Sequence, residues 1–123
     1  MSLTNIEKIK LPGGREVSIN ELLSFIYGVP KADIEILRII EKKGKATTDE
    51  ISEMLRTTKP SVSKSLNNLV KKGLIEREKL RDGTRRGRPV FIYKVSSNLL
   101  DEKIIADLNQ VTSDIREKLK KAN

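Results

Sequence analysis

Residues 47–75 carry the sequence TTDEISEMLRTTKPSVSKSLNNLVKKGLI, and this stretch decides the fold. Thr47 and Glu50 have the spacing of a capping box, in which two residues bond each other's backbone N–H groups at a helix start. The box predicts a helix over residues 49–56, with a buried face formed by Ile51, Met54 and Leu55. A turn at residues 57–58 then leads into a second helix.

The second helix is predicted over residues 59–72, because Gly73 supplies the left-handed conformation that ends many helices. At about 100° per residue, its apolar side chains fall on one broad stripe. This stripe consists of Val62, Leu66, Leu69 and Val70. The opposite face centres on Lys64. Two helices joined by so short a turn are typical of a helix-turn-helix.

Two strands are predicted after this unit, over residues 74–80 and 90–96, with a loop over residues 81–89 between them. Within the loop, Asp82-Gly83 is a strong turn signal. The loop also holds four arginines: Arg81, Arg85, Arg86 and Arg88. A helix-turn-helix followed by a basic hairpin of this kind predicts a winged helix, with the loop as its wing.

Charge is concentrated in the same part of the chain. Residues 54–94 hold 12 Lys and Arg against 3 Asp and Glu, a balance of +9, while the rest of the chain holds 13 against 14, a balance of −1. The net charge of +8 therefore belongs to about a third of the sequence. A basic footprint confined to one module predicts binding to a phosphate backbone.

The residue types on the second helix fit contact with duplex DNA. Lys and Asn can bond base edges in the major groove, and Ser near a helix start can hold phosphate. The predicted contacts on this helix are Lys59, Pro60, Ser61, Ser63, Lys64, Asn67, Asn68 and Lys71. The four loop arginines suit a narrow minor groove. A merely solvated helix face and a solubilising loop are the alternative interpretations.

The chain before the winged helix is predicted to form a small unit of its own. Pro12-Gly13-Gly14 lies between two short alternating segments and predicts a hairpin. Ser18 and Glu21 form a second capping box, which opens a short helix over residues 19–27. The following helix starts at Pro30, is about 13 residues long by its apolar spacing, and stops at Gly44.

The last helix is predicted over residues 99–121. It carries an apolar seam with the spacing of a coiled coil, formed by Leu100, Ile104, Leu108, Val111, Ile115 and Leu119. The seam favours pairing with a second subunit, and folding back onto the winged helix is the alternative.

The predicted fold is mainly α (α+β), a winged helix-turn-helix with a long C-terminal dimerisation helix. The expected division is 1–29 for the N-terminal hairpin and short helix, 30–96 for the DNA-binding domain and 97–123 for the dimerisation helix.

Several functional classes are disfavoured by what the 123 residues lack. The sequence has no His and no Cys, so it has neither a nucleophile–histidine pair nor a thiolate zinc site. It contains no phosphate-binding loop motif. We therefore expect no enzyme, no cofactor and no metal. We find no signal peptide and no bilayer-spanning apolar run, so we expect no membrane partner and a cytoplasmic, nucleoid-associated protein.

These segments resemble a known family. The run KPSVSKSLNNLVKKGLIER at residues 59–77 and GRPVFIY at residues 87–93 are similar to the MarR/ArsR-like winged helix-turn-helix regulators. The start IKLPGG at residues 9–14 resembles the short Lrs-like archaeal regulators. The resemblance implies a homodimer that binds double-stranded DNA and represses or activates nearby promoters. It also implies residues 59–72 as recognition helix. Larger relatives carry a ligand-sensing domain for which this chain has no room, so a small-molecule effector is not expected.

Three functions remain open from the sequence. The first is a sequence-specific transcriptional regulator, which the polar face of the second helix favours. The second is a non-specific architectural protein, which the same basic segment would serve. The third is a winged-helix module that binds protein, because a fold does not fix a function.

Overall fold

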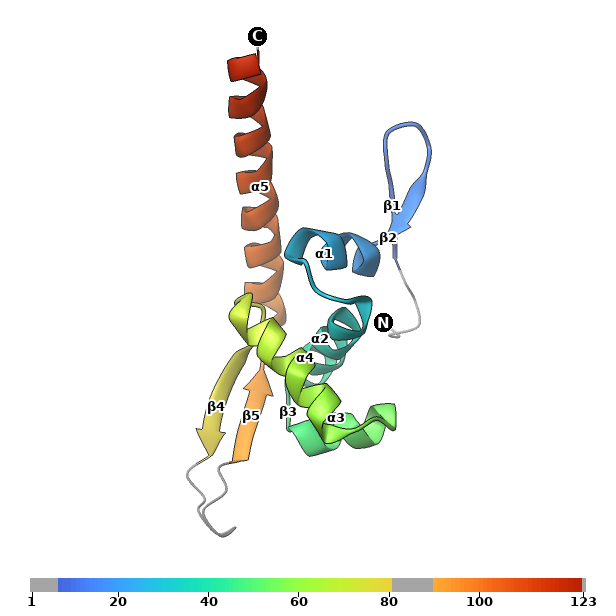
Figure 1. Ribbon diagram of the computed structural model, residues 1–123, viewed down its shortest axis with the longest axis vertical. Coiled ribbons are helices and arrows are strands. Elements are labelled where there is room, and N and C mark those ends of the chain that lie inside the picture. Colours follow the sequence, from blue (N-terminus) through green and yellow to red (C-terminus); the bar gives the residue numbers. More distant parts are fainter. Residues whose placement is uncertain (1–6, 81–89, 123) are drawn as a thin grey trace.

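The computed structural model describes residues 7–80 and 90–122 (Figure 1). The predicted wing, residues 81–89, lies outside the described residues. The elements follow the chain as β1 (Lys8–Lys10), β2 (Glu16–Ser18), α1 (Ile19–Tyr27), α2 (Lys31–Lys43), β3 (Lys45–Ala46), α3 (Thr48–Leu55), α4 (Lys59–Lys71), β4 (Glu76–Leu80), β5 (Val90–Lys94) and α5 (Ser97–Ala122). The predicted fold, an α+β winged helix with a long C-terminal helix, is confirmed.

Both predicted capping boxes are present. Before α1, the Glu21 N–H donates to Ser18 Oγ at 3.0 Å, and the Glu21 carboxylate accepts from the Ser18 backbone. Before α3, the Thr47 N–H donates to Glu50 Oε1 at 2.8 Å, and the Glu50 N–H returns a bond to the Thr47 hydroxyl. Pro30 lies one position earlier than predicted, because it occupies the N-cap of α2 with extended backbone and the helix begins at Lys31.

The winged-helix sheet has three antiparallel strands in the order β3-β5-β4. The pairing of β4 with β5 confirms the predicted hairpin, with Arg77 opposite Tyr93 and Leu80 opposite Val90. The third strand, β3, was not predicted from the sequence. It has two residues, Lys45 and Ala46, and so short a segment shows no alternation that could reveal it.

A single core joins the helices to the sheet. The side chains of Ile34, Leu37, Ile40, Ile51 and Leu66 are fully buried within it. Leu23 and Val29 from the N-terminal part and Leu100 from α5 belong to the same cluster. All three predicted units of the chain therefore contribute side chains to one core.

The predicted buried face of α3 was partly wrong. Ile51 is fully buried, but Met54 and Leu55 are 53% and 40% exposed. The inward position beside Ile51 belongs instead to Ser52, whose hydroxyl donates to the Thr57 carbonyl at 2.6 Å and holds the turn. Because α3 ends at Leu55, with the next residue in a left-handed conformation, its last turn no longer faces the core.

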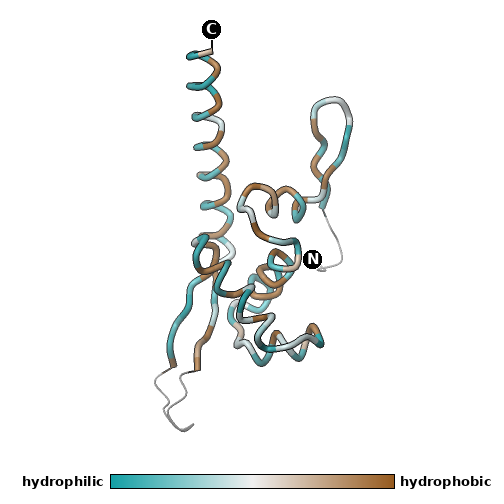
Figure 2. The backbone as a smooth tube through the Cα atoms, in the orientation of Figure 1, coloured by the Kyte–Doolittle hydropathy of each residue, from teal (hydrophilic) through white to brown (hydrophobic). Residues whose placement is uncertain are grey.

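The molecule is extended at two opposite ends (Figure 1). Strands β4 and β5 project from one end, and the C-terminal half of α5 projects from the other. The β1–β2 hairpin lies on the same side as the free end of α5, and α1 lies between them. Figure 2 shows apolar and polar residues alternating along the projecting part of α5. Among the described residues, no helix has the length and apolar character needed to cross a membrane.

Candidate nucleic-acid interface

The outer face of α4 is a continuous polar stripe. Pro60, Lys64, Asn67 and Lys71 follow helical spacing and are exposed. The buried residues of the same helix are Val62, Ser65, Leu66 and Leu69. Val70, expected in the buried stripe, is half-buried and packs against the core. The outer stripe carries no acidic side chain, so a polyanion could approach it without charge repulsion.

The start of α4 has donors and a cation for an anionic group. Thr58 is the N-cap, and its hydroxyl accepts the Ser61 N–H at 3.3 Å. Lys59 and Ser61 are exposed at this positive helix end, which favours negative charge. Lys59 Nζ lies 3.3 Å from Asp49 Oδ1, but both side chains are about 65% exposed. An ion pair this exposed contributes little, so the lysine can exchange its carboxylate for a phosphate at low cost.

Asn68 has a different environment from its neighbour Asn67. Its amide Nδ2 donates to Asp33 Oδ2 at 3.1 Å, and Asp33 is only 3% exposed. Asn68 is half-buried on the flank of α4 that faces α2. The sequence interpretation put it on the outer face beside Asn67, and the structure instead engages its amide inside the domain. Ser63 is also half-buried, at the margin where the sequence had put it.

Arg77 on β4 is a candidate contact that the sequence reveals only as part of the basic segment. Its Nη1 donates to Asn67 Oδ1 at 3.4 Å, and its guanidinium carbon lies 4.9 Å from the centre of the Phe91 ring. Stacking on the ring fixes the plane of the guanidinium. The bond to Asn67 turns the amide oxygen toward Arg77, which leaves the NH₂ group available to a partner. The alternation of Glu76, Arg77, Glu78 and Lys79 along the strand was the only sequence signal.

The wing arginines Arg81, Arg85, Arg86 and Arg88 lie outside the described residues. The strands that bound this segment end at Leu80 and Val90, which pair directly with each other. This end of the hairpin is the one remote from α5 (Figure 1).

The apolar seam of α5 divides into two parts. Leu100 is 2% exposed, and Ile104 packs against the core, so the first turns fold onto the chain's own winged helix. Leu108 is half-buried. The later seam residues are exposed: Val111 by 41%, Ile115 by 53% and Leu119 by 61%. Folding back onto the winged helix is thus observed for the proximal seam residues, whereas the described seam residues of the distal half are uncovered.

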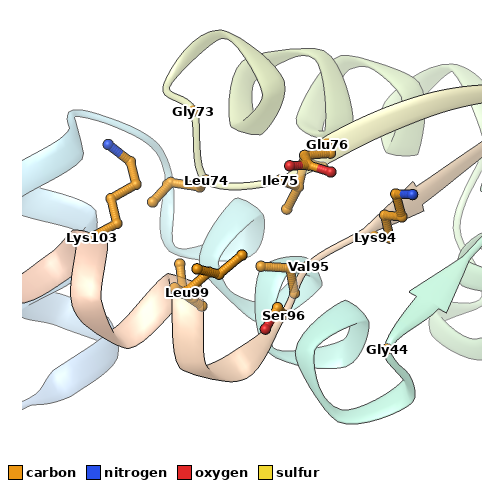
Figure 3. A pocket seen from close by; sticks show the side chains of 11 residues that line it. Gly44, Gly73, Leu74, Ile75, Glu76, Lys94, Val95, Ser96, Leu99 and Lys103 are labelled. Atoms are coloured by element: carbon orange, nitrogen blue, oxygen red, sulfur yellow. The ribbon is translucent and has the colours of Figure 1, made fainter.

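A pocket of about 350 Å³ lies where α5 leaves the sheet (Figure 3). Leu74, Val95 and Leu99 line its middle, with Lys94 and Lys103 toward its two ends. Both lysines already have carboxylate partners, Glu78 at 3.3 Å and Asp107 at 3.0 Å. Across the described ranges 7–80 and 90–122, no three acidic side chains gather as a metal site would require.

Comparison with known proteins agrees with this geometry. Residues 27–86 match the model of the MarR family. A possible transcriptional regulator from Methanosarcina mazei has a TM-score of 0.78 at 21% identity, covering 95% of this chain and 98% of that one. A protein of the archaeon Sulfolobus tokodaii has a TM-score of 0.65 at 23% identity, covering 80% of this chain and 92% of that one.

One relative in sequence is an uncharacterized protein of Pyrococcus abyssi, 36% identical over 56 residues. The match covers 45% of this chain but only 17% of that protein. It therefore concerns a segment of a much longer protein. The similarity of the solved structures establishes the winged-helix fold. Over residues 27–86, slightly less than half of the chain, the sequence is similar to the MarR family.

Proposed function

We propose that the protein is a homodimeric regulator that reads double-stranded DNA with α4 in the major groove. The observation that carries this proposal is the acid-free outer stripe of α4, formed by Pro60, Lys64, Asn67 and Lys71. The stripe spans about three helical turns, and an α-helix fits a major groove. Lys59 and Ser61 at the positive end of the helix would hold a phosphate and set the register.

Base discrimination would come from Lys64 and Asn67. Since Arg77 engages the Asn67 oxygen at 3.4 Å, the amide offers mainly its NH₂ group. Lysine offers only donors as well. Two neighbouring donors favour acceptor-rich base edges, such as the O6 and N7 atoms of guanine. We therefore expect a guanine-containing half-site under α4.

Residues 81–89 would act as a wing on the minor groove or backbone. The paired strand ends Leu80 and Val90 lie at the end of the hairpin that is remote from α5 (Figure 1). Four arginines on so short a segment suit an electronegative groove. Arg81, Arg85, Arg86 and Arg88 are the proposed wing contacts.

The homodimer would form through the distal half of α5. Val111, Ile115 and Leu119 are exposed along one side of this helix. About four turns of α5 follow Leu108, a length of roughly 21 Å at 1.5 Å per residue. The same face on a second copy is the simplest complement, in a two-fold symmetric pair. Such a pair would present two copies of α4 to grooves about 34 Å apart. Residues 97–123 would thus be the dimerisation unit and residues 30–96 the reading domain.

The test is a selection of bound duplexes from a random-sequence library, followed by titration of the selected and random duplexes across a salt series. A regulator should enrich a two-fold repeated sequence and prefer it over random DNA by about 10³-fold or more. Equal, steeply salt-dependent binding to both duplexes would favour the architectural function. Absence of binding even at low salt would reject both and leave a protein-binding module.

A further inference from the structure

The position of α5 relative to the winged helix is fixed by few contacts. At its first residue, the Ser97 hydroxyl donates to Glu41 Oε2 at 3.1 Å. The other oxygen of Glu41 accepts from Arg38 at 2.9 Å, so the base of α5 is tied to α2. Leu100 then enters the core. Beyond this base, and among the described residues, α5 has one further side-chain hydrogen bond to a distant part of the chain.

That second bond runs between α1 and α5. The Tyr27 hydroxyl donates to Asp107 Oδ2 at 2.5 Å. Lys103 Nζ contacts the same oxygen at 3.0 Å and lies 5.9 Å from the centre of the Tyr27 ring. We call Tyr27, Lys103 and Asp107 the α1–α5 clamp. Its partners Tyr27 and Asp107 are 80 residues apart in the chain.

The protonation states of the clamp favour a strong bond. The hydrogen bond from Tyr27 lowers the pKa of the Asp107 carboxyl, with the Lys103 contact acting in the same direction. Burial and the bond to Asp107 both raise the pKa of the Tyr27 phenol. Around neutral pH the aspartate is therefore charged and the phenol protonated. Hydrogen bonds from O–H to a carboxylate are among the stronger ones in proteins.

The bonds at Ser97 and at Asp107 together fix the direction of α5 relative to the winged helix. Ser97 and Asp107 are ten residues apart, about 15 Å along the helix axis at 1.5 Å per residue. A rod held at two points this far apart cannot tilt freely. All described residues of α5 after Leu108 are exposed, so the turn that holds Asp107 and Leu108 is the last one that the described part of the chain covers. In Figure 1, α1 lies beside the proximal half of α5 and leaves the distal half free.

We propose that the α1–α5 clamp is a positioning device that sets the distance between the two copies of α4, and hence the half-site spacing that the dimer accepts. This inference rests on the proposed homodimer. A tilt of about 10° pivoting at Leu100 would move the far end of α5 by roughly 6 Å, given 1.5 Å of rise per residue. Successive base pairs are about 3.4 Å apart. Loss of the clamp would therefore change the preferred half-site spacing by one to two base pairs, or let the dimer accept several spacings within that range.

The chain offers a matched pair of variants. Asp107→Asn and Asp114→Asn each remove the carboxylate of an i,i+4 lysine pair on α5, with Lys103 at 3.0 Å and Lys118 at 3.1 Å respectively. Only Asp107 also bonds to α1. Tyr27→Phe removes this bond altogether and keeps the ring, whereas Asp107→Asn only weakens it, because the amide oxygen can still accept from the phenol but carries no negative charge. Thermal unfolding of each variant establishes that it is folded before the direction of α5 is measured.

The direction of α5 is measured without DNA. The sequence contains no cysteine, so Glu53→Cys on α3 and Ser113→Cys on α5 give two unique, exposed sites for spin labels. Labelled chains are mixed with excess unlabelled chains, so that only distances within one chain are detected. We expect one narrow distance distribution for the parent and Asp114→Asn, and a broader, displaced one for Tyr27→Phe and Asp107→Asn. Unchanged distributions in both clamp variants would overturn the proposal.

The spacing is measured on the selected duplex, with the two half-sites moved apart or together one base pair at a time. The parent and Asp114→Asn should prefer one spacing, whereas the clamp variants should prefer another or bind several equally well. Binding to a single half-site should not change. An unaltered spacing preference in the clamp variants would also overturn the proposal. If the parent itself is monomeric or selects no sequence, the proposed function fails. The distances between the spin labels still decide whether the clamp fixes the direction of α5.

Discussion

At the scale of single residues, Asn67 and Asn68 show how neighbouring side chains of one type take different roles. Asn67 is exposed beside Arg77, while Asn68 donates to the buried Asp33 at 3.1 Å. Asn67→Ala should weaken binding to the selected duplex by about 1–3 kcal/mol and leave the melting temperature unchanged. Asn68→Ala should lower the free energy of unfolding by about 1–3 kcal/mol, because a buried carboxylate loses its donor.

Binding titrations and thermal denaturation of both variants test this division of roles. A loss of sequence preference in Asn68→Ala without any loss of stability would contradict it. The sequence could not separate the two residues, because only the position of α2 decides which flank of α4 is covered.

Arg77 is the residue whose role is easiest to miss in a sequence. Its neighbours in space, Asn67 and Phe91, come from a helix and from the paired strand. Arg77→Lys keeps the charge but loses the planar fork that stacks and bonds at once. We expect this variant to bind random DNA as the parent does, and to select a less uniform base opposite Asn67. The measurement is a repeat of the library selection, and identical selected sequences would show that Arg77 does not orient the amide.

The α1–α5 clamp predicts a pH dependence of stability. Since the folded state raises the pKa of Tyr27, the bond contributes fully below the unfolded phenol's pKa of about 10 and is lost as pH rises through the folded value. Since it lowers the pKa of Asp107, the contribution is present above about 3.9 and is lost as pH falls through the folded value. The difference in unfolding free energy between the parent and Tyr27→Phe should therefore be greatest near neutrality and shrink at both extremes. A difference independent of pH would argue against the bond.

At the scale of elements, local sequence signals predicted most of the helices. They failed where contacts between distant segments determine a strand or the burial of a side chain. The capping boxes at Ser18 and Thr47 and the turn before Lys59 located α1, α3 and α4 within about a residue, because such bonds lie within four positions in the chain. Strand β3 is defined only by its pairing with β5. The exposure of Met54 follows from where α3 ends against the core. Neither could be read from spacing alone.

The distal half of α5 carries the prediction that belongs to this scale. Ile115 is 53% exposed on the seam, and Ser113 is exposed about 160° away on the opposite side of the helix. Ile115→Lys and Ser113→Lys therefore introduce the same charge on opposite faces of α5. We expect Ile115→Lys to be monomeric by sedimentation, since a lysine would be buried without a partner in the paired helices. Ser113→Lys should remain dimeric, and the reverse result would move the interface to the other face.

At the scale of the whole molecule, the protein has a basic end and an opposite end with exposed apolar residues on α5. Residues 54–94 carry the +9 balance. In Figure 1 the strands that lead into the wing point away from the free end of α5. The sequence alone predicted this polarity, because charge and apolar spacing are properties of segments. It could not predict that Leu23, Leu100 and the clamp join the two ends through one core, because those contacts bridge residues far apart in the chain.

The wing gives the last prediction, which concerns the charge of the assembled protein. Each phosphate that a cation neutralises adds about 0.9 to the steepness of log affinity against log salt. Replacing Arg81, Arg85, Arg86 and Arg88 together by Gln should therefore reduce the steepness by up to roughly 7 for a dimer with eight wing arginines, and by less if some point to solvent. The preference for selected over random duplex should largely remain, since phosphate contacts position a protein and base contacts specify the sequence. An unchanged salt dependence would show that the arginines only solubilise the loop, and would leave α4 as the sole carrier of DNA binding.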